Sequence, residues 1–453
     1  MPRYEFKEGS SSKFWEITLN ANSFTTRWGR IGTAGQEKTQ TFDNSVDARK
    51  EYEKLVREKE KKGYELVGEA GEGGEAEDGD GGGELASNPE LEAAILSNPD
   101  NVDAYLVYGD WLQRQGDPRG ELIALQHAAM QASGAEATSL KKQVKARIKK
   151  YQDVLLGEDL ENAEDQEALS EVEWHLGFIR KARVGRKDFD AEGEVPDIVK
   201  ALLSHPSARF IQELTIGMAD FEENHYDGVI SAIAEVGSKT LQRLFIGDFE
   251  YPDETEMSWT YINDVSPLYK ALPALRALRL RGGSVDLGTI DLPELREFTV
   301  ETGGLPLAAV KSIASASWPK LERLEVWFGQ DNYGGEGGVE DIQPILDGKG
   351  LPALKHLGLC NSEFVDELCK VLPRAKILPQ LETLNLSMGT MSEEGARALS
   401  ENAAAFKHLK HLDLQQNTLT AEAQRLVAKL CPSVALGGQR EYEEEYRYSA
   451  VGE

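Results

Sequence analysis

The 453-residue sequence predicts an α/β protein of several domains: a small sheet-plus-helix domain, a helical connecting segment and a longer array of strand–helix repeats. Three observations support this prediction. A leucine frame recurs through the second half of the chain, strand and helix patterns fill the first 66 residues, and residues 68–84 contain only Gly, Glu, Asp and Ala. A segment of that composition has nothing to bury and is expected to be disordered. The predicted domains are therefore 1–67, 88–181 and 182–453, with a disordered acidic linker over 68–87.

The charge of the chain is unevenly distributed. The formal net charge is −28, yet residues 1–65 hold 13 Lys and Arg against 11 Asp and Glu, which leaves −30 for the remaining residues. Most of the surface therefore repels phosphate, and a nucleic acid is expected to meet only the first domain. No apolar run approaches ~18 residues, the chain start lacks a signal-like apolar core, and three cysteines form no disulfide or zinc pattern. We expect a cytoplasmic protein without membrane contact.

The first domain is predicted to contain strands followed by a helix. Residues 14–19 and 24–31 have strand character around a turn at 20–23, and a third extended run covers 38–42. Asn44 or Ser45 caps a helix that ends at Gly63.

A specific motif lies on these strands. Arg27-Trp28-Gly29-Arg30-Ile31-Gly32-Thr33 is followed by Gly35-Gln36, Phe42, Ala48, Glu58-Lys59 and Lys62-Gly63-Tyr64. This set closely resembles the WGR domain over about residues 3–66, which occurs in DNA-dependent poly(ADP-ribose) polymerases and in bacterial proteins described as molybdate-metabolism regulators.

The resemblance implies a nucleic-acid site. In the polymerases the Trp and Arg of the motif meet the sugar and phosphate of a terminal nucleotide, which carries over to Trp28 and Arg30. An indole face can stack and a guanidinium can bind phosphate, while Arg27 and Lys38 would add phosphate attraction. The alternative is that Trp28 is a core residue and that Arg30 forms a structural ion pair. In the polymerases the domain also contacts other protein domains.

The next segment is predicted to be helical. Leu91, Ile95, Leu106 and Leu112 recur at helical intervals before a break near Pro118, and the stretch resembles a repeat-companion segment found in bacterial repeat proteins. The charged group at residues 110–121 has no nucleophile or phosphate loop beside it, so it is interpreted as a capped turn tied by ion pairs. The basic run 141–151 either contacts nucleic acid or an acidic partner, or forms a solvated helix face.

The leucine frame L-x-x-L-x-L predicts a repeat fold. Its eight copies begin at Ile211, Leu241, Leu275, Leu295, Leu321, Leu354, Leu381 and Leu409, a period of about 28 residues. The alternation predicts a strand in each copy and helices between copies, which is the leucine-rich repeat of ribonuclease-inhibitor type: a solenoid with strands on its concave side. The asparagine expected after each strand is kept only at Asn417, and Gly283, Gly303, Gly329 and Gly389 replace it elsewhere.

Residues between the buried leucines should face the concave side and bind a protein partner, because aromatic and arginine side chains are typical interface anchors. The candidates are Arg243, Phe245, Arg279, Arg281, Arg323, Glu325, Trp327, His356, Asn385, His411 and Asp413. Phe245 and Trp327 could instead cover neighbouring leucines.

Catalytic signatures are missing from the sequence. It contains no G-x-x-x-x-G-K-[ST], G-x-S-x-G or H-E-x-x-H motif, and the resemblance to the polymerases ends at residue 66. We therefore expect a non-enzymatic adaptor with no cofactor or metal, which binds a protein through the repeats and a nucleic-acid end or second protein through the WGR domain. The alternatives are a bacterial transcriptional or metabolic regulator and an enzyme hidden within 130–210.

Overall fold

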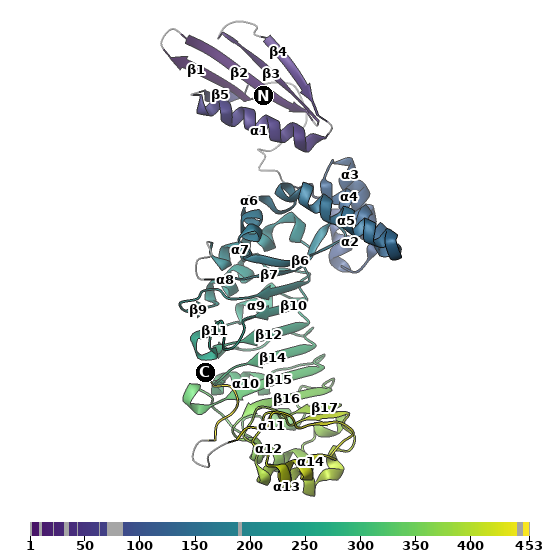
Figure 1. Cartoon of the computed structure of the whole chain (residues 1–453), viewed down its shortest axis with the longest axis vertical. Coiled ribbons are helices and arrows are strands. Elements are labelled where there is room, and N and C mark those ends of the chain that lie inside the picture. Colours follow the sequence, from purple (N-terminus) through teal and green to yellow (C-terminus); the bar gives the residue numbers. More distant parts are fainter. Residues whose placement is uncertain are drawn as a thin grey trace. The chain divides into compact units, whose positions relative to one another are not determined.

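A computed structural model describes residues 2–8, 11–20, 22–30, 36–42, 44–62, 64–69, 85–188, 193–441 and 447–452. Contacts divide the chain into two units, Met1–Glu84 and Leu85–Glu453, each drawn in Figure 1 and described here by itself. Residues 70–84, on which most of the expected linker falls, lie outside the described residues. No helix among the described residues is long and apolar enough to cross a membrane.

The first unit is a five-stranded antiparallel sheet with one helix against it. Its elements are β1 (Pro2–Glu8), β2 (Ser11–Asn20), β3 (Ser23–Arg30), β4 (Gln36–Thr41), α1 (Ser45–Lys61) and β5 (Glu65–Glu69), in the sheet order β4-β3-β2-β1-β5. Trp15, Ile17 and Phe24 form the core with Leu55 and Val56 of α1. The predicted boundary at residue 67 is wrong, because it cuts β5, which pairs with β1 as far as Glu69.

The second unit opens with five helices: α2 (Pro89–Ser97), α3 (Val102–Arg114), α4 (Pro118–Gln131), α5 (Gly134–Lys150) and α6 (Gln152–Asp165). The side chain of Asn88 accepts hydrogen bonds from the first turn of α2, and Asp117 does so for α4, which fixes where both helices begin. Residues 85–87 were assigned to the predicted linker, but in the structure they belong to the second unit. Leu85 is buried, and the backbone N–H of Ala86 donates to Asp117 Oδ2 at 3.1 Å.

Arg119 and Asp117 form a buried ion pair that ties the helices to the rest of the unit. Arg119 is completely buried and donates from Nε and Nη2 to the two carboxylate oxygens of Asp117, at 3.0 and 2.7 Å. It also donates to the carbonyl oxygens of Ala86 (2.7 Å) and Pro206 (3.2 Å). The charge is thus paired and hydrogen-bonded on all sides, as a buried charge requires. The interpretation of this charged group as a capped turn tied by an ion pair agrees with these contacts.

A sheet of eleven strands follows, in the order β19-β18-β17-β16-β15-β14-β12-β10-β8-β7-β6. Its strands are β6 (Leu169–His175), β7 (Phe178–Val184), β8 (Glu213–Ile216), β10 (Arg243–Ile246), β12 (Ala277–Arg281), β14 (Glu297–Glu301), β15 (Arg323–Gly329), β16 (His356–Ser362), β17 (Thr383–Asn385), β18 (His411–Asp413) and β19 (Val434–Ala435). All neighbours pair in parallel except β6 and β7. Each of the eight copies of the leucine frame supplies one strand, from β8 to β18.

Helices lie on one side of this sheet, as Figure 1 shows. They are α7 (Val195–Ser204), α8 (Asp227–Val236), α9 (Pro267–Ala271), α10 (Leu307–Ser315), α11 (Gln343–Leu346), α12 (Val365–Val371), α13 (Glu393–Glu401) and α14 (Ala421–Val427). A smaller parallel sheet of β9 (Asn224–His225), β11 (Thr260–Asp264) and β13 (Gly283–Asp286) accompanies the first repeats.

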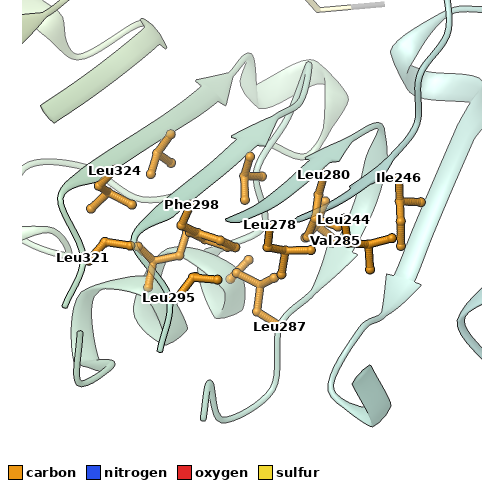
Figure 2. Packing of buried hydrophobic residues seen from close by; sticks show 14 of the residues in the cluster. Leu244, Ile246, Leu278, Leu280, Val285, Leu287, Leu295, Phe298, Leu321 and Leu324 are labelled. Atoms are coloured by element: carbon orange, nitrogen blue, oxygen red, sulfur yellow. The ribbon is translucent and has the colours of Figure 1, made fainter. Parts of the chain in front are cut away.

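The frame residues stack in register across the sheet. One row runs through Leu214, Leu244, Leu278, Phe298, Leu324, Leu357, Leu384 and Leu412, each at most 2% exposed. Figure 2 shows part of this row packed with the neighbouring row that holds Ile246 and Leu280. Burial of every frame residue in one continuous cluster explains why the frame repeats.

The predicted boundary between 181 and 182 is also wrong. It falls inside β7, which pairs with β8 and joins β6 to the same sheet. Tyr105 and Tyr108 of α3 share an aromatic cluster with Phe178 of β7 and with Phe210. The helical segment and the repeats are therefore packed as one unit.

We predict that Leu357→Ala lowers the free energy of unfolding of the second unit by ~2–5 kcal/mol, because it leaves a cavity in the leucine row. Arg323→Ala, an exposed neighbour on β15, should change it by no more than ~0.5 kcal/mol. Urea denaturation of the full chain measures both values, and equal losses would contradict the assignment of the two faces.

We also predict that Arg119→Met destabilises the second unit by ~3–5 kcal/mol, because it leaves the buried Asp117 carboxylate without its partner. The matched control is Arg180→Met. Arg180 pairs with Asp100 at 2.8 Å, but the two side chains are 29% and 61% exposed, so the loss should stay within ~1 kcal/mol. If Arg180→Met lowered the free energy of unfolding as much as Arg119→Met, burial of the ion pair would not be the cause of the loss.

Candidate binding surfaces

The register of the first unit brings Trp28 and Lys38 to the same face of the sheet. Trp28 lies opposite Trp15 on β2, and Lys38 lies opposite Thr26, the next residue on the Trp28 face of β3. Residues directly opposite in an antiparallel pair point to one side. Trp15 is 3% exposed, whereas Trp28 is 37% exposed. A pocket of about 280 Å³ is lined by Trp15, Phe24, Thr26, Trp28, Lys38, Gln40, Leu55 and Lys59.

Arg27 lies on the other face, so the predicted four-residue site is divided. Its Nη1 is 3.6 Å from Glu16 Oε2, and its guanidinium lies 5.8 Å from the centre of the Phe14 ring. The cause is the two-residue period of a strand, which sends neighbouring side chains to opposite faces. The backbone of Arg30 pairs with Lys13 near the end of β3, and the side chain of Arg30 lies outside the described residues.

Lys59 is a pocket residue that was not among the predicted site residues. It comes from α1, and its ammonium lies 5.4 Å from the ring centre of Trp15 and 5.0 Å from that of Tyr64. A second cation therefore lines the pocket that Trp28 borders. The Glu58-Lys59 part of the motif was the available signal for this residue.

In the second unit, the side chains between the frame residues form rows on the sheet face opposite the leucines. The first row runs through Arg243, Ala277, Glu297, Arg323, His356, Thr383 and His411, and the second through Phe245, Arg279, Thr299, Glu325, Gly358, Asn385 and Asp413. Alternation along the strands also places Arg281 and Trp327 on this side. The register thus brings all eleven predicted partner-binding residues to one surface, here called the sheet face.

Near β12 the sheet face carries a tight charged cluster. Glu301 is 4% exposed and binds both Arg279 (2.7 Å) and Arg281 (2.6 Å). The two guanidiniums lie 4.3 and 5.5 Å from the Phe245 ring centre. Arg281 also donates to the Phe249 carbonyl oxygen at 2.8 Å, and its side chain is only 19% exposed. Arg281 is therefore held internally, whereas Arg279, at 42%, reaches solvent.

A further arginine extends the basic part of this face. Arg183 on β7 lies opposite Thr215 of β8, which lies opposite Phe245 and so extends the second row. Arg183 forms an ion pair with Asp248 at 2.7 Å. Sequence patterns missed it, because β7 carries no leucine frame. Arginines thus concentrate on β7, β10 and β12.

The other half of the sheet face is less basic. Trp327 Nε1 donates to Glu325 Oε1 at 3.1 Å, and His356 Nδ1 lies 2.8 Å from Thr383 Oγ1. Burial lowers the pKa of His356, and Arg323 beside it adds to the effect. Among the described residues, no cluster of three His, Cys, Asp or Glu side chains could hold a metal ion. This half of the sheet face therefore presents hydrogen-bonding groups, charges and an aromatic side chain.

Comparison with known proteins identifies the first unit. The family model of the WGR domain matches residues 3–71. The chain is 36% identical over 63 residues to the Escherichia coli protein YfeS, covering 14% of this chain and 26% of that protein. It is 42% identical over 62 residues to the human protein mono-ADP-ribosyltransferase PARP3, covering 13% and 12%. The chain thus spans only a minor part of the length of these relatives.

A solved structure resembles the whole chain. It is a Bacteroides fragilis protein with a TM-score of 0.52 and 22% identity, and the match covers 100% of this chain and 99% of that one. This similarity concerns the fold alone. The matches to the first unit are specific in sequence, and they carry the conclusion that residues 3–71 form a WGR domain.

Proposed function

We propose that the protein is a non-catalytic adaptor whose second unit is a leucine-rich-repeat solenoid that binds a protein partner. The observation that carries this proposal is the register of β8 to β18. It buries every frame residue on the helix side and leaves the sheet face as a polar and aromatic surface that no helix of the described residues covers. An extended surface of this kind is what stacked repeats provide for binding.

The basic part of the sheet face indicates what kind of partner fits. Arg243 and Arg279 are half exposed. Arg243 forms an ion pair with Glu297 at 3.4 Å, whereas Arg279 shares the Glu301 carboxylate with Arg281, so that two guanidinium groups have one carboxylate between them. The Phe245 ring lies beneath the Arg279 guanidinium and fixes its position. An acidic segment of a protein partner would complete this charge pattern.

The WGR domain is proposed to bind a nucleic-acid end or a second protein. The support for nucleic acid is that the exposed Trp28 shares its pocket with two cations, Lys38 and Lys59. An aromatic face beside cations suits a base or sugar next to a phosphate. The chain is proposed to act in the cytoplasm, where its free thiols Cys360, Cys369 and Cys431 would remain reduced.

We predict that the full chain binds nicked DNA with a 5′-phosphate better than intact duplex at low salt. Trp28→Ala should weaken this binding by ~1–3 kcal/mol through lost stacking, almost independently of salt. Lys38→Ala and Arg30→Ala should each reduce the slope of log K against log salt by about 1. Arg27→Ala, on the opposite face, is the matched control and should leave the affinity unchanged. Titration of labelled duplexes at two salt concentrations gives these values.

Two outcomes would contradict the nucleic-acid proposal. The first is no binding of either duplex by the folded chain at low salt, which would leave a purely protein-binding adaptor. The second is a loss with Arg27→Ala as large as that with Trp28→Ala, which would place the contact away from the pocket.

A further inference from the structure

Residues 447–452 lie against the end of β16 and the loops that follow β14, β15 and β17, and many of the contacts are made by the backbone of this segment. The side-chain amide of Asn361 donates to the Val451 carbonyl oxygen at 2.6 Å and accepts from the Val451 N–H at 2.9 Å. Gln330 Nε2 donates to the Ser449 carbonyl oxygen at 3.1 Å, and the Ala450 N–H donates to the Met388 carbonyl oxygen at 2.8 Å. Hydrogen bonds to successive main-chain groups are the usual basis for binding a peptide segment.

Two side chains of the segment also hold it in place. Arg447 forms an ion pair with Asp366 at 3.3 Å and donates to the Thr390 carbonyl oxygen, and Val451 provides an apolar anchor. Val451 is 8% exposed and belongs to an apolar cluster with Met218, Phe249 and Met257, against which Trp327 also packs. This cluster is separate from the leucine core. Methionine side chains adapt to different apolar partners, so such a pocket suits a single aliphatic side chain.

Glycines on both sides allow the close approach of the segment. A Cβ atom on Gly303 would lie 1.8 Å from the Gly452 carbonyl oxygen and 2.6 Å from its carbonyl carbon. A Cβ atom on Gly452 would lie 2.5 Å from Gln330 Nε2. Gly303 replaces the asparagine expected after the strand, and the space beside it is filled by the segment.

We propose that this groove is a peptide-binding site, occupied in the structure by the chain's own 447–452 segment, and that a protein partner binds by placing a similar segment there. The ligand is a short stretch of small residues followed by one aliphatic anchor and a glycine, as in Ser449-Ala450-Val451-Gly452. The proposal rests on the proposed partner-binding function and adds a groove next to Trp327 at the edge of the sheet face. Residues 447–452 compete with the partner for the groove within the same molecule. A partner therefore binds measurably only when its segment has a higher affinity than this tethered segment can offset.

Three full-length variants and a labelled peptide test the groove. Val451→Asp puts a charge into the apolar cluster and should expel the segment while leaving the groove intact. The labelled peptide RYSAVGE, which copies residues 447–453, should then bind Val451→Asp at least tenfold more tightly than the unmodified chain in fluorescence anisotropy. Adding Gly303→Ala to Val451→Asp should abolish this gain, because the new methyl group occupies the place of the glycine carbonyl. Gly338→Ala is the matched control, since a Cβ atom there meets nothing within 4 Å.

The peptide RYSADGE should bind none of these proteins. The proposal is overturned if Val451→Asp does not bind RYSAVGE, if Gly303→Ala has no effect on the binding, or if Val451→Asp unfolds the second unit as a core deletion would. In the last case the segment is a structural part of the unit. Each of these failures removes only the groove, because none of the substitutions replaces a residue of the sheet face or of the Trp28 pocket.

Discussion

The in-register stacking of parallel strands is the constraint on which the rest of the second unit depends. Successive side chains of a strand point to opposite faces, so a shift of one residue in any strand would turn its frame leucines outward. The observed register keeps Leu214 to Leu412 in one buried row from β8 to β18. The same register determines which residues lie on the sheet face and are available for binding. Because Leu278 and Val326 are buried, the next residues along their strands, Arg279 and Trp327, point to the sheet face.

Much of this arrangement could be predicted from the sequence, because alternation is a local signal. Each Leu-x-Leu pair marks a strand by itself, and all eight copies are strands in the structure. The β6–β7 hairpin was missed because its place in the sheet depends on pairing with β8, which no local pattern shows. The start of the second unit was misplaced for a similar reason. Ala86 has the composition of a linker residue, and its hydrogen bond to Asp117, 31 residues further along the chain, has no local sequence signal.

The candidate sites, like the fold, were predictable from the sequence only where the signal is local. The motif located Trp28 and Lys38 correctly on one face, whereas Arg27 was grouped with them although it is adjacent to Trp28 in a predicted strand. The alternation needed to separate the two was present in the sequence. By contrast, the internal pairing of Arg281 with Glu301 depends on the side-chain arrangement across two strands, and the binding of Val451 by Asn361 joins residues 90 positions apart. Neither contact has a sequence signal.

The strands of the sheet face share a single buried row of side chains, from which we infer that the sheet face is one rigid surface. Native-state amide hydrogen exchange of the full chain tests this claim most directly. We predict that the slowest amides of β8, β10, β12 and β14 to β18 exchange through one common opening with the same free energy, and that the WGR domain opens separately. A boundary within the row, with β16 to β18 opening well before β10 and β12, would contradict it, because the sheet face would then consist of two surfaces that move independently.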